Sequence, residues 1–147
     1  MKWDQRFMRI ATEVATWSKD PRSKVGAVLV QHRNIVATGY NGFPKGIADD
    51  SRLEYGDQKL PIIVHAEMNA ILDAGRLSRG ATLYMIAPFG GMPCRNCAKH
   101  LITAGVARVV ALPPNPRPSK WHIEGVQGGN LLREAGVVTE VFDVRDT

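Results

Sequence analysis

Apolar residues recur every three or four positions near the start of the chain. This spacing predicts an amphipathic helix over about residues 4–18, ending before Pro21. Charged residues fall between the apolar ones, so one face of this helix is expected to pack on the rest of the protein. The apolar positions that define the pattern are Phe7, Ile10, Ala11, Val14 and Trp17.

The pattern then changes to short runs rich in β-branched residues. Residues 24–31 and 35–41 form two such runs. The "HRN" tripeptide between them allows a tight turn, so we expect a β-hairpin. Further strands are predicted at residues 81–87, 108–112 and 137–142.

Helical segments precede or separate these later strands. Each ends at a glycine, the residue that most often terminates a helix, and the predicted helices cover residues 66–74, 97–104 and 128–135. A proline-rich connector at 113–121 leads to the last of them, and residues 43–61 show no clear period. A loop of that length in a compact domain is usually functional or mobile.

The order of the elements predicts the fold class. Strands that alternate with helices favour a mostly parallel sheet with helices on both faces. We therefore expect an α/β protein, a three-layer α/β/α sandwich with a five-stranded mixed sheet. In it the first hairpin is antiparallel and strands 4 and 5 are parallel. No linker or repeat divides the sequence, so we expect one domain over residues 1–147.

Composition narrows the class of protein. A chain of 147 residues can bury enough surface to fold without disulfides or a structural metal. No apolar run approaches the ~18 residues of a membrane span, and the first residues lack the apolar core of a signal peptide. We therefore expect a cytoplasmic protein with no membrane partner. The net charge of +5 suits an anionic partner as well as simple solubility. The basic residues form no single block, which argues against a nucleic-acid partner.

The only two cysteines, Cys94 and Cys97, lie three residues apart at a predicted helix start. This spacing places both sulfur atoms on one helix face, and the helix N-terminus favours the thiolate form that binds metals. His65 lies at another predicted helix start and would add an imidazole. Three protein ligands and one open position are typical of catalytic zinc. Glu67 would then stand beside a water molecule at that position and accept its proton.

Other interpretations of these residues stay open at this point. The two cysteines would also suit a dithiol redox pair, although such a pair needs no His-x-Glu sequence and the order of elements is not that of thioredoxin. A closed structural zinc site could combine His65 with His100 or His122, but it would leave Glu67 without a role. A histidine at a helix start is, taken alone, more often a cap or a core residue than a ligand.

The two motifs together are far more specific than either one. The sequence "HAE" followed by "PCRNC" matches the His-x-Glu…Pro-Cys-x-x-Cys pattern of zinc-dependent nucleobase deaminases. With "SKDPRSKVGAVLV", "GYNGFPKGIADD", "HAEMNAIL" and "CAKHLITAGV", the chain resembles the deoxycytidylate (dCMP) deaminase family over nearly its whole length. The resemblance implies that His65, Cys94 and Cys97 hold one Zn²⁺ per subunit. It also implies that Glu67 transfers protons while dCMP is hydrolysed to dUMP and ammonia, which feeds thymidylate synthesis.

The resemblance further implies contacts to the nucleotide. The backbone N–H of Ala66 would hold the pyrimidine O2, and Asn41 would contact the nucleotide, although an Asn at a strand end is also a common turn residue. Trp121 and His122 would close over the substrate, unless Trp121 simply covers the proline-rich connector. The phosphate contacts are expected among Ser18, Lys19, Arg22 and Lys24.

Regulation and assembly follow from the same resemblance. Members of the family are typically hexamers that dCTP activates and dTTP inhibits. The segment "NGFPKGIADD" matches the effector loop, which would bind a triphosphate and its Mg²⁺; a solvated polar loop is the alternative. The expected effector residues are Gly42, Lys45, Gly46, Asp49 and Asp50.

Two departures from the family pattern affect the choice of substrate. The "FGGM" insertion before Pro93, which contains Gly90 and Gly91, borders the pocket expected for the cytosine 5-position, so the enzyme could accept a 5-substituted dCMP. The chain also has no cysteine left for a second, structural zinc. The alternative functions are deamination of a free nucleoside, of guanine or of a tRNA adenosine, and a non-catalytic zinc interaction module.

Overall fold

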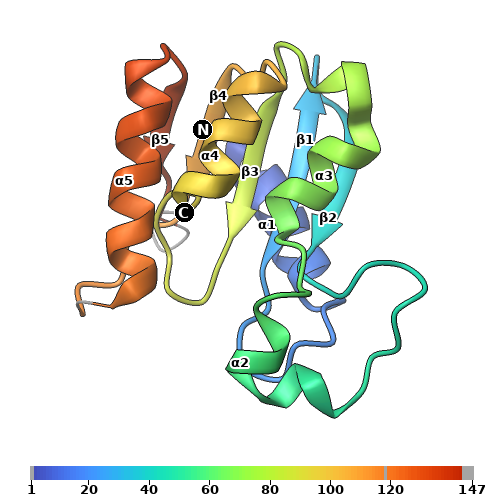
Figure 1. Ribbon diagram of the computed structural model, residues 1–147. Coiled ribbons are helices and arrows are strands. Elements are labelled where there is room, and N and C mark those ends of the chain that lie inside the picture. The colour runs from blue at the N-terminus through green and yellow to red at the C-terminus, as the bar shows by residue number, and fades with distance from the viewer. Residues whose placement is uncertain (1, 118, 144–147) are drawn as a thin grey trace.

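The computed structural model describes residues 2–117 and 119–143 and contains a five-stranded sheet with the order β2-β1-β3-β4-β5 (Figure 1). The β1–β2 pair is antiparallel, and β3–β4 and β4–β5 are parallel. The predicted hairpin, mixed sheet and parallel last pair are therefore confirmed. The strands are β1 (Gly26–Gln31), β2 (Asn34–Tyr40), β3 (Thr82–Ile86), β4 (Arg108–Ala111) and β5 (Val138–Val141).

The sheet is less parallel than the sequence predicted, because β1 lies between β2 and β3. It pairs with both in antiparallel fashion, so only half of the pairings in the sheet are parallel. Strands β2 and β3 consequently run in the same direction, as a strand–helix–strand unit requires, although they are not neighbours. Their C-terminal ends therefore lie at the same end of the sheet.

Helices cover both faces of the sheet (Figure 1). Alternation along β1 explains this, since successive side chains point to opposite faces. Val28 and Val30 pack with the first helix, whereas Ala27 and Leu29 pack with the later helices. The result is the expected three-layer sandwich, with α1 (Lys2–Ala15) on one face and α3 (Ala66–Ala74), α4 (Arg95–Thr103) and α5 (Lys120–Glu134) on the other.

Helix α5 begins well before the predicted start at residue 128. Its glycines lower the intrinsic helix propensity, so the apolar pattern did not predict the first two turns. The side chain of Ser119 caps the helix by accepting a hydrogen bond from the His122 N–H at 3.1 Å. A Cβ at Gly128 would lie 1.8 Å from the Pro93 carbonyl oxygen, so glycine is required there by packing. Among the described residues, no helix combines the length and apolar character needed to cross a bilayer.

The patternless segment at 43–61 is only partly irregular. It contains a 3-10 helix, η1 (Ser51–Glu54), and a short helix, α2 (Gly56–Lys59), and Leu53 is buried. A β-bridge between Gly42 and Val64 joins its two ends. The segment therefore folds over the end of the sheet where β2 and β3 finish (Figure 1). A second 3-10 helix, η2 (Gly75–Ser78), follows α3.

Candidate active site

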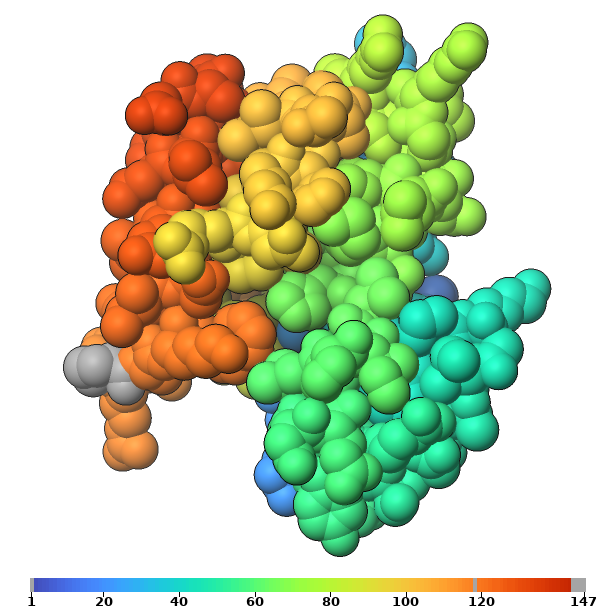
Figure 2. Space-filling model, viewed as in Figure 1, coloured from blue at the N-terminus to red at the C-terminus, as the bar shows by residue number. Residues whose placement is uncertain are grey.

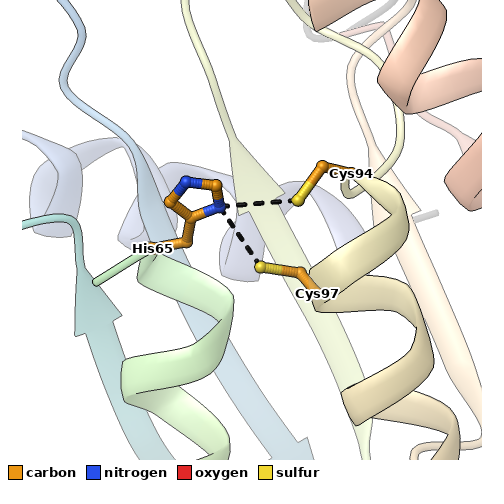
Figure 3. A group of neighbouring side chains, drawn as sticks. All are labelled: His65, Cys94 and Cys97. Carbon is orange, nitrogen blue, oxygen red and sulfur yellow. Dashed lines mark hydrogen bonds between the residues drawn. The ribbon is translucent and has the colours of Figure 1, made fainter. Parts of the chain in front are cut away.

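Two helices begin side by side at the end of the sheet where β2 and β3 finish. His65 is the N-cap residue of α3, and Cys94 is the N-cap residue of α4. Helix α3 packs directly on β2, since a Cβ at Gly39 would lie 2.2 Å from the Ala66 carbonyl oxygen. This close packing brings two motifs distant in sequence to one place (Figure 3).

The side chains of these two helix starts form a cluster of metal-ligand type. The Nδ1 atom of His65 lies 3.5 Å from Sγ of Cys94 and 3.3 Å from Sγ of Cys97 (Figure 3). All three ligand atoms lie within 4.8 Å of one another. Two thiolates and one imidazole are a donor set that Zn²⁺ prefers. The residues therefore fit a zinc ion with three protein ligands.

The alternative ligands for a closed zinc site do not join this cluster. His100 Nδ1 lies 2.6 Å from the Asn96 carbonyl oxygen of its own helix. His122 lines a different cavity, of about 200 Å³. Within the described part of the chain, His65, Cys94 and Cys97 form the only group of three or more His, Cys, Asp or Glu side chains placed to share a metal ion. This arrangement favours an open site over a structural Cys2His2 site.

Contacts within the cluster favour the thiolate form of Cys94. A hydrogen bond from the Cys97 thiol lowers the pKa of Cys94 to about 4, and His65 adds to this effect. The same contact raises the pKa of Cys97. The contact with Cys94 also raises the pKa of His65. One proton is thus already lost from the cysteine pair near neutral pH, and the thiolate is the form that binds metals.

Glu67 lies in the first turn of α3 and is almost completely buried, with 4% of its surface exposed. Burial raises the pKa of its carboxyl group, and the nearby His65 offsets this only in part. A buried carboxyl with a raised pKa beside a metal site is typical of groups that carry protons in catalysis.

A cavity of about 250 Å³ opens at the cluster. His65, Cys94 and Glu67 line it, whereas the buried Cys97 does not. Figure 2 shows the molecule hollowed between the green segment around α2 and the orange segment that begins α5. The ring of Trp121 stacks on Phe89 with a centroid distance of 5.8 Å and stands edge-on to His65 at 5.7 Å. The cavity thus has an aromatic wall beside its metal-ligating side chains.

Residues 1–112 match the family model described as the cytidine and deoxycytidylate deaminase zinc-binding region. The chain belongs to this deaminase family. It is 40% identical to human deoxycytidylate deaminase, over 97% of this chain and 80% of the relative. It is also 40% identical to a deaminase of Aliivibrio fischeri, over 92% of this chain and 90% of the relative.

A solved structure shares the fold. The dCMP deaminase of cyanophage S-TIM5, in complex with dCMP and dUMP, superposes with a TM-score of 0.76 at 28% identity. The match covers 96% of this chain and 97% of the phage chain. The resemblance inferred from the sequence motifs is confirmed, and with it a deaminase-type fold.

The residues expected to bind substrate divide into two sets in this deaminase. Asn41, Ala66 and Trp121 line the cavity. The Asn41 side chain accepts a hydrogen bond from the Val25 N–H at 2.8 Å and donates one to the Ser23 carbonyl at 2.7 Å. It therefore also holds the loop between α1 and β1. The residues that do not line the cavity are Ser18, Lys19, Arg22, Lys24 and His122.

Two members of that second set make hydrogen bonds elsewhere. The Ser18 hydroxyl is buried and donates to the Asn41 carbonyl at 2.7 Å. The Lys24 ammonium donates to the Ser18 carbonyl at 2.6 Å. His122 Nδ1 is buried and has no hydrogen-bond partner among the described residues.

The residues expected to bind an effector lie outside the cavity. Gly42 pairs with Val64, and the Asp50 side chain caps η1 and accepts from Arg52 Nε at 2.8 Å. Lys45 and Asp49 are exposed beside them. Gly46, also exposed, has a φ of +99°.

The "FGGM" insertion contributes its bulky residues to the cavity, since Phe89 and Met92 line it and Gly90 and Gly91 do not. A Cβ at Gly90 would lie 2.0 Å from the Pro113 carbonyl oxygen. The glycine is thus needed for packing on the connector rather than for widening the pocket.

The structure also adds residues that the sequence pattern did not indicate. Asp20, Ser23, Lys59 and Lys120 line the cavity together with the predicted residues. Lys59 lies in the segment without a period, and Lys120 lies in the part of α5 for which the sequence predicts a proline-rich connector. Asp20 and Ser23 lie within the "SKDPRSKVGAVLV" motif, whereas the signal for Lys59 was its position, six residues before His65.

Proposed function

We propose that this deaminase is a zinc-dependent dCMP deaminase, which hydrolyses dCMP to dUMP and ammonia. The observation that carries the proposal is the meeting of three zinc-type ligands with the buried Glu67 at a cavity. The nucleotide is supported by relatives named deoxycytidylate deaminase and by a solved relative that holds dCMP and dUMP. Such an enzyme supplies dUMP for thymidylate synthesis.

In this proposal His65, Cys94 and Cys97 hold the zinc ion. When bound, the ion supplies the Lewis acidity that activates a water molecule near neutral pH. Glu67 accepts one proton from the attacking water and delivers it to N3 of the cytosine. It then takes the second proton from the new C4 hydroxyl group and passes it to the amine, which leaves as ammonia while the C4 carbonyl forms. Its buried position beside His65 suits this transfer, because water does not compete for the proton.

The first turn of α3 orients the base. The N–H of Ala66 is one of the helix-start donors that have no intrahelical partner, and Ala66 lines the cavity. We assign it to the pyrimidine O2. Trp121 covers the ring, supported by Phe89 and, from the neighbouring cavity, by His122. Asn41 contacts the nucleotide while its amide holds the α1–β1 loop.

The remaining predicted contacts act through that loop. Ser18, Arg22 and Lys24 flank Asp20 and Ser23, the two loop residues that line the cavity. We propose that they stabilise the loop rather than reach the substrate with their own side chains.

We also propose, from the family resemblance, that the enzyme is a hexamer that dCTP with Mg²⁺ activates and dTTP inhibits. The support is that the exposed segment continues into η1 and α2, and α2 contributes to the cavity wall. The effector residues in this proposal are Gly42, Lys45, Gly46, Asp49 and Asp50.

The experiment is an ultraviolet deamination assay of the zinc-loaded protein with dCMP, deoxycytidine, CMP and 5-methyl-dCMP, each with and without dCTP and Mg²⁺. Loss of cytosine absorbance with dCMP, and much slower loss with deoxycytidine, is the expected result. Turnover of 5-methyl-dCMP would show that the wall formed by Phe89 and Met92 admits a methyl group. If no cytosine compound reacts while zinc is fully bound, the proposal fails, and guanine and tRNA adenosine become the substrates to test.

A further inference from the structure

The basic residues expected to bind phosphate are not those that the cavity presents. The cationic side chains that line it, within the described residues, are Lys59 and Lys120. Lys120 is exposed and lies over the Trp121 ring, 5.2 Å from its centroid. Lys59 is different, because only 14% of its side chain is exposed. A mostly buried ammonium on a cavity wall needs an anionic partner.

The structure supplies one such partner, Asp20, at 2.9 Å from the Lys59 ammonium. The Asp20 side chain is 1% exposed. Its Oδ1 accepts hydrogen bonds from the N–H groups of Arg22 and Ser23 at 2.9 and 3.0 Å. Burial alone would raise the pKa of Asp20, but these N–H groups and Lys59 outweigh it and the pKa is lowered. In the "SKDPRSKV" motif the immobilised carboxylate of Asp20 therefore lines the cavity, whereas the cationic side chains of the motif do not.

The backbone fixes Lys59 relative to the metal-ligand cluster. Its carbonyl oxygen accepts from the N–H groups of Ile62 and Ile63 at 3.0 and 2.9 Å. The next residue, Val64, is held by its bridge to Gly42, and His65 follows directly. A short, hydrogen-bonded turn thus holds the backbone of Lys59 in place relative to His65, and Asp20 holds the ammonium.

The Lys59 ammonium also has donors to spare. An ammonium carries three N–H donors, and Asp20 is the one carboxylate that pairs with it among the described residues. A phosphate monoester requires charge-assisted hydrogen bonds when it is bound out of bulk water.

We propose that Lys59 binds the 5′-phosphate of the nucleotide substrate and that Asp20 is a positioning residue, which holds the ammonium at the cavity wall. This inference rests on the proposed function, since it requires a nucleotide whose base lies at His65. It assigns the preference for a nucleotide over a nucleoside to a residue in the 43–61 segment.

The test compares dCMP and deoxycytidine as substrates of the zinc-loaded wild type, Lys59→Met, Lys59→Arg and Lys99→Met. Loss of a charged hydrogen bond is expected to raise the KM for dCMP in Lys59→Met by about 10- to 100-fold. The kcat/KM for deoxycytidine should stay unchanged. Lys59→Arg keeps the charge and should retain most of the preference. Lys99 is an exposed lysine on α4, so Lys99→Met controls for the loss of one charge.

Asp20 is tested by its dependence on Lys59. Asp20→Asn keeps an oxygen for the two backbone N–H groups and removes the charge that holds the ammonium. It is expected to raise the KM for dCMP by about 3- to 10-fold and leave kcat and the deoxycytidine reaction unchanged. The double variant with Lys59→Met should be no worse than Lys59→Met alone, because coupled residues are not additive. Additive effects would overturn the positioning role.

Two results overturn the phosphate assignment. One is a wild type that prefers dCMP while Lys59→Met keeps that preference. The other is a Lys59→Met protein that loses both substrates equally, with Lys59→Arg no better, which marks a structural role. Calorimetric titration with dUMP and deoxyuridine gives a readout that needs no turnover, and Lys59→Met should weaken dUMP alone. A wild type that does not deaminate dCMP contradicts the proposed function instead, so the two failures are distinguishable.

Discussion

Two buried carboxyl groups, Glu67 and Asp4, lie toward opposite ends of the sheet and are buried in opposite ways. At the end where β2 and β3 finish, the buried Glu67 lies beside a His–Cys–Cys cluster and faces a cavity. Toward the other end, Asp4 on α1 accepts a hydrogen bond from the Tyr84 hydroxyl at 2.6 Å and one from an Arg108 N–H at 2.7 Å. Arg108 at the start of β4 also donates to Glu140 at 2.9 Å.

The two carboxyl groups differ in the direction of their pKa shift, which distinguishes a structural role from a chemical one. The end with Asp4, Tyr84, Arg108 and Glu140 is called the paired end, and the end with Glu67 the cavity end. At the paired end, burial would raise the pKa of Asp4, but Arg108 and Tyr84 outweigh it and the pKa falls below its ordinary value. At the cavity end, burial of Glu67 prevails and its pKa rises. At the paired end, ionisation of Asp4 favours the folded state, whereas the cavity end keeps a carboxyl in a state that costs stability and permits proton transfer.

Glu67→Gln is the strongest test of this contrast. The amide cannot carry a proton, so kcat for dCMP should fall by about 1000-fold. Because a neutral amide suits the buried position, the free energy of unfolding should stay equal or rise. Zinc content, measured by inductively coupled plasma mass spectrometry, should stay at one ion per chain, and thermal unfolding measures the stability.

Glu13→Gln, at an exposed position on α1, is the matched control and should change neither kcat nor stability. A Glu67→Gln protein that loses zinc or melts early would place Glu67 with the structural charges and remove the contrast.

The sequence predicted the cavity end better than it predicted the rest of the site. His65, Glu67, Cys94 and Cys97 could be found because each pair lies within one helical turn, so local spacing fixes their relation. Helix α3 was predicted with its observed bounds, since apolar period and a terminal glycine agree there. The predicted order of helices and strands was enough to place the His65–Glu67 pair and the Cys94–Cys97 pair at the same end of the sheet.

The remainder depended on contacts between distant segments. Lys59 belongs to a segment with no period and gains its role from Asp20, 39 residues earlier in the sequence. The first two turns of α5, which the pattern missed, contain Gly125, where a Cβ would lie 3.0 Å from the Met92 carbonyl oxygen; they too pack against a segment distant in the sequence. The insertion of β1 between β2 and β3 is set by pairing across the sheet. Single-sequence patterns do not contain these relations.

Arg108→Met tests the paired end. It leaves Asp4, whose side chain is 7% exposed, as an unpaired buried charge, so the free energy of unfolding should fall by about 3 kcal/mol in urea titrations. The kcat for dCMP per folded molecule should not change, because the network lies away from the cavity.

Adding Asp4→Asn to Arg108→Met should restore much of the lost stability, since both charges are then gone. A loss below about 1 kcal/mol in the single variant would mean that the network behaves like a surface ion pair, and the contrast between the two ends would weaken.

Gly128→Ala tests how tightly the cavity end is built. The new Cβ would lie 1.8 Å from the Pro93 carbonyl oxygen and must displace the residue before Cys94. Zinc affinity, measured by competition with a chelator, is expected to fall by about tenfold, as when a support of a metal ligand is removed. In Gly129→Ala the Cβ would meet only flexible side-chain atoms of Arg133 and Met92, at 3.3 Å. Equal zinc affinity in both variants would show that α5 does not hold Cys94.

The smallest expected effect is on how the contribution of Asp4 to the free energy of unfolding changes with pH, which should reverse its sign in Arg108→Met. In the wild type the folded pKa of Asp4 lies below the ordinary value of 3.8, so its contribution to stability is full above pH 3.8 and is lost as the pH falls through the folded pKa. In Arg108→Met the hydrogen bond from Tyr84 remains, but burial, the largest influence on Asp4, loses the opposing effect of Arg108, so the folded pKa of Asp4 should rise above 3.8. Its destabilising contribution then grows as the pH rises from 4 to 7. Urea titrations across this range should show the gap between the two proteins narrowing toward pH 4, and a constant gap would mean that Asp4 finds another partner.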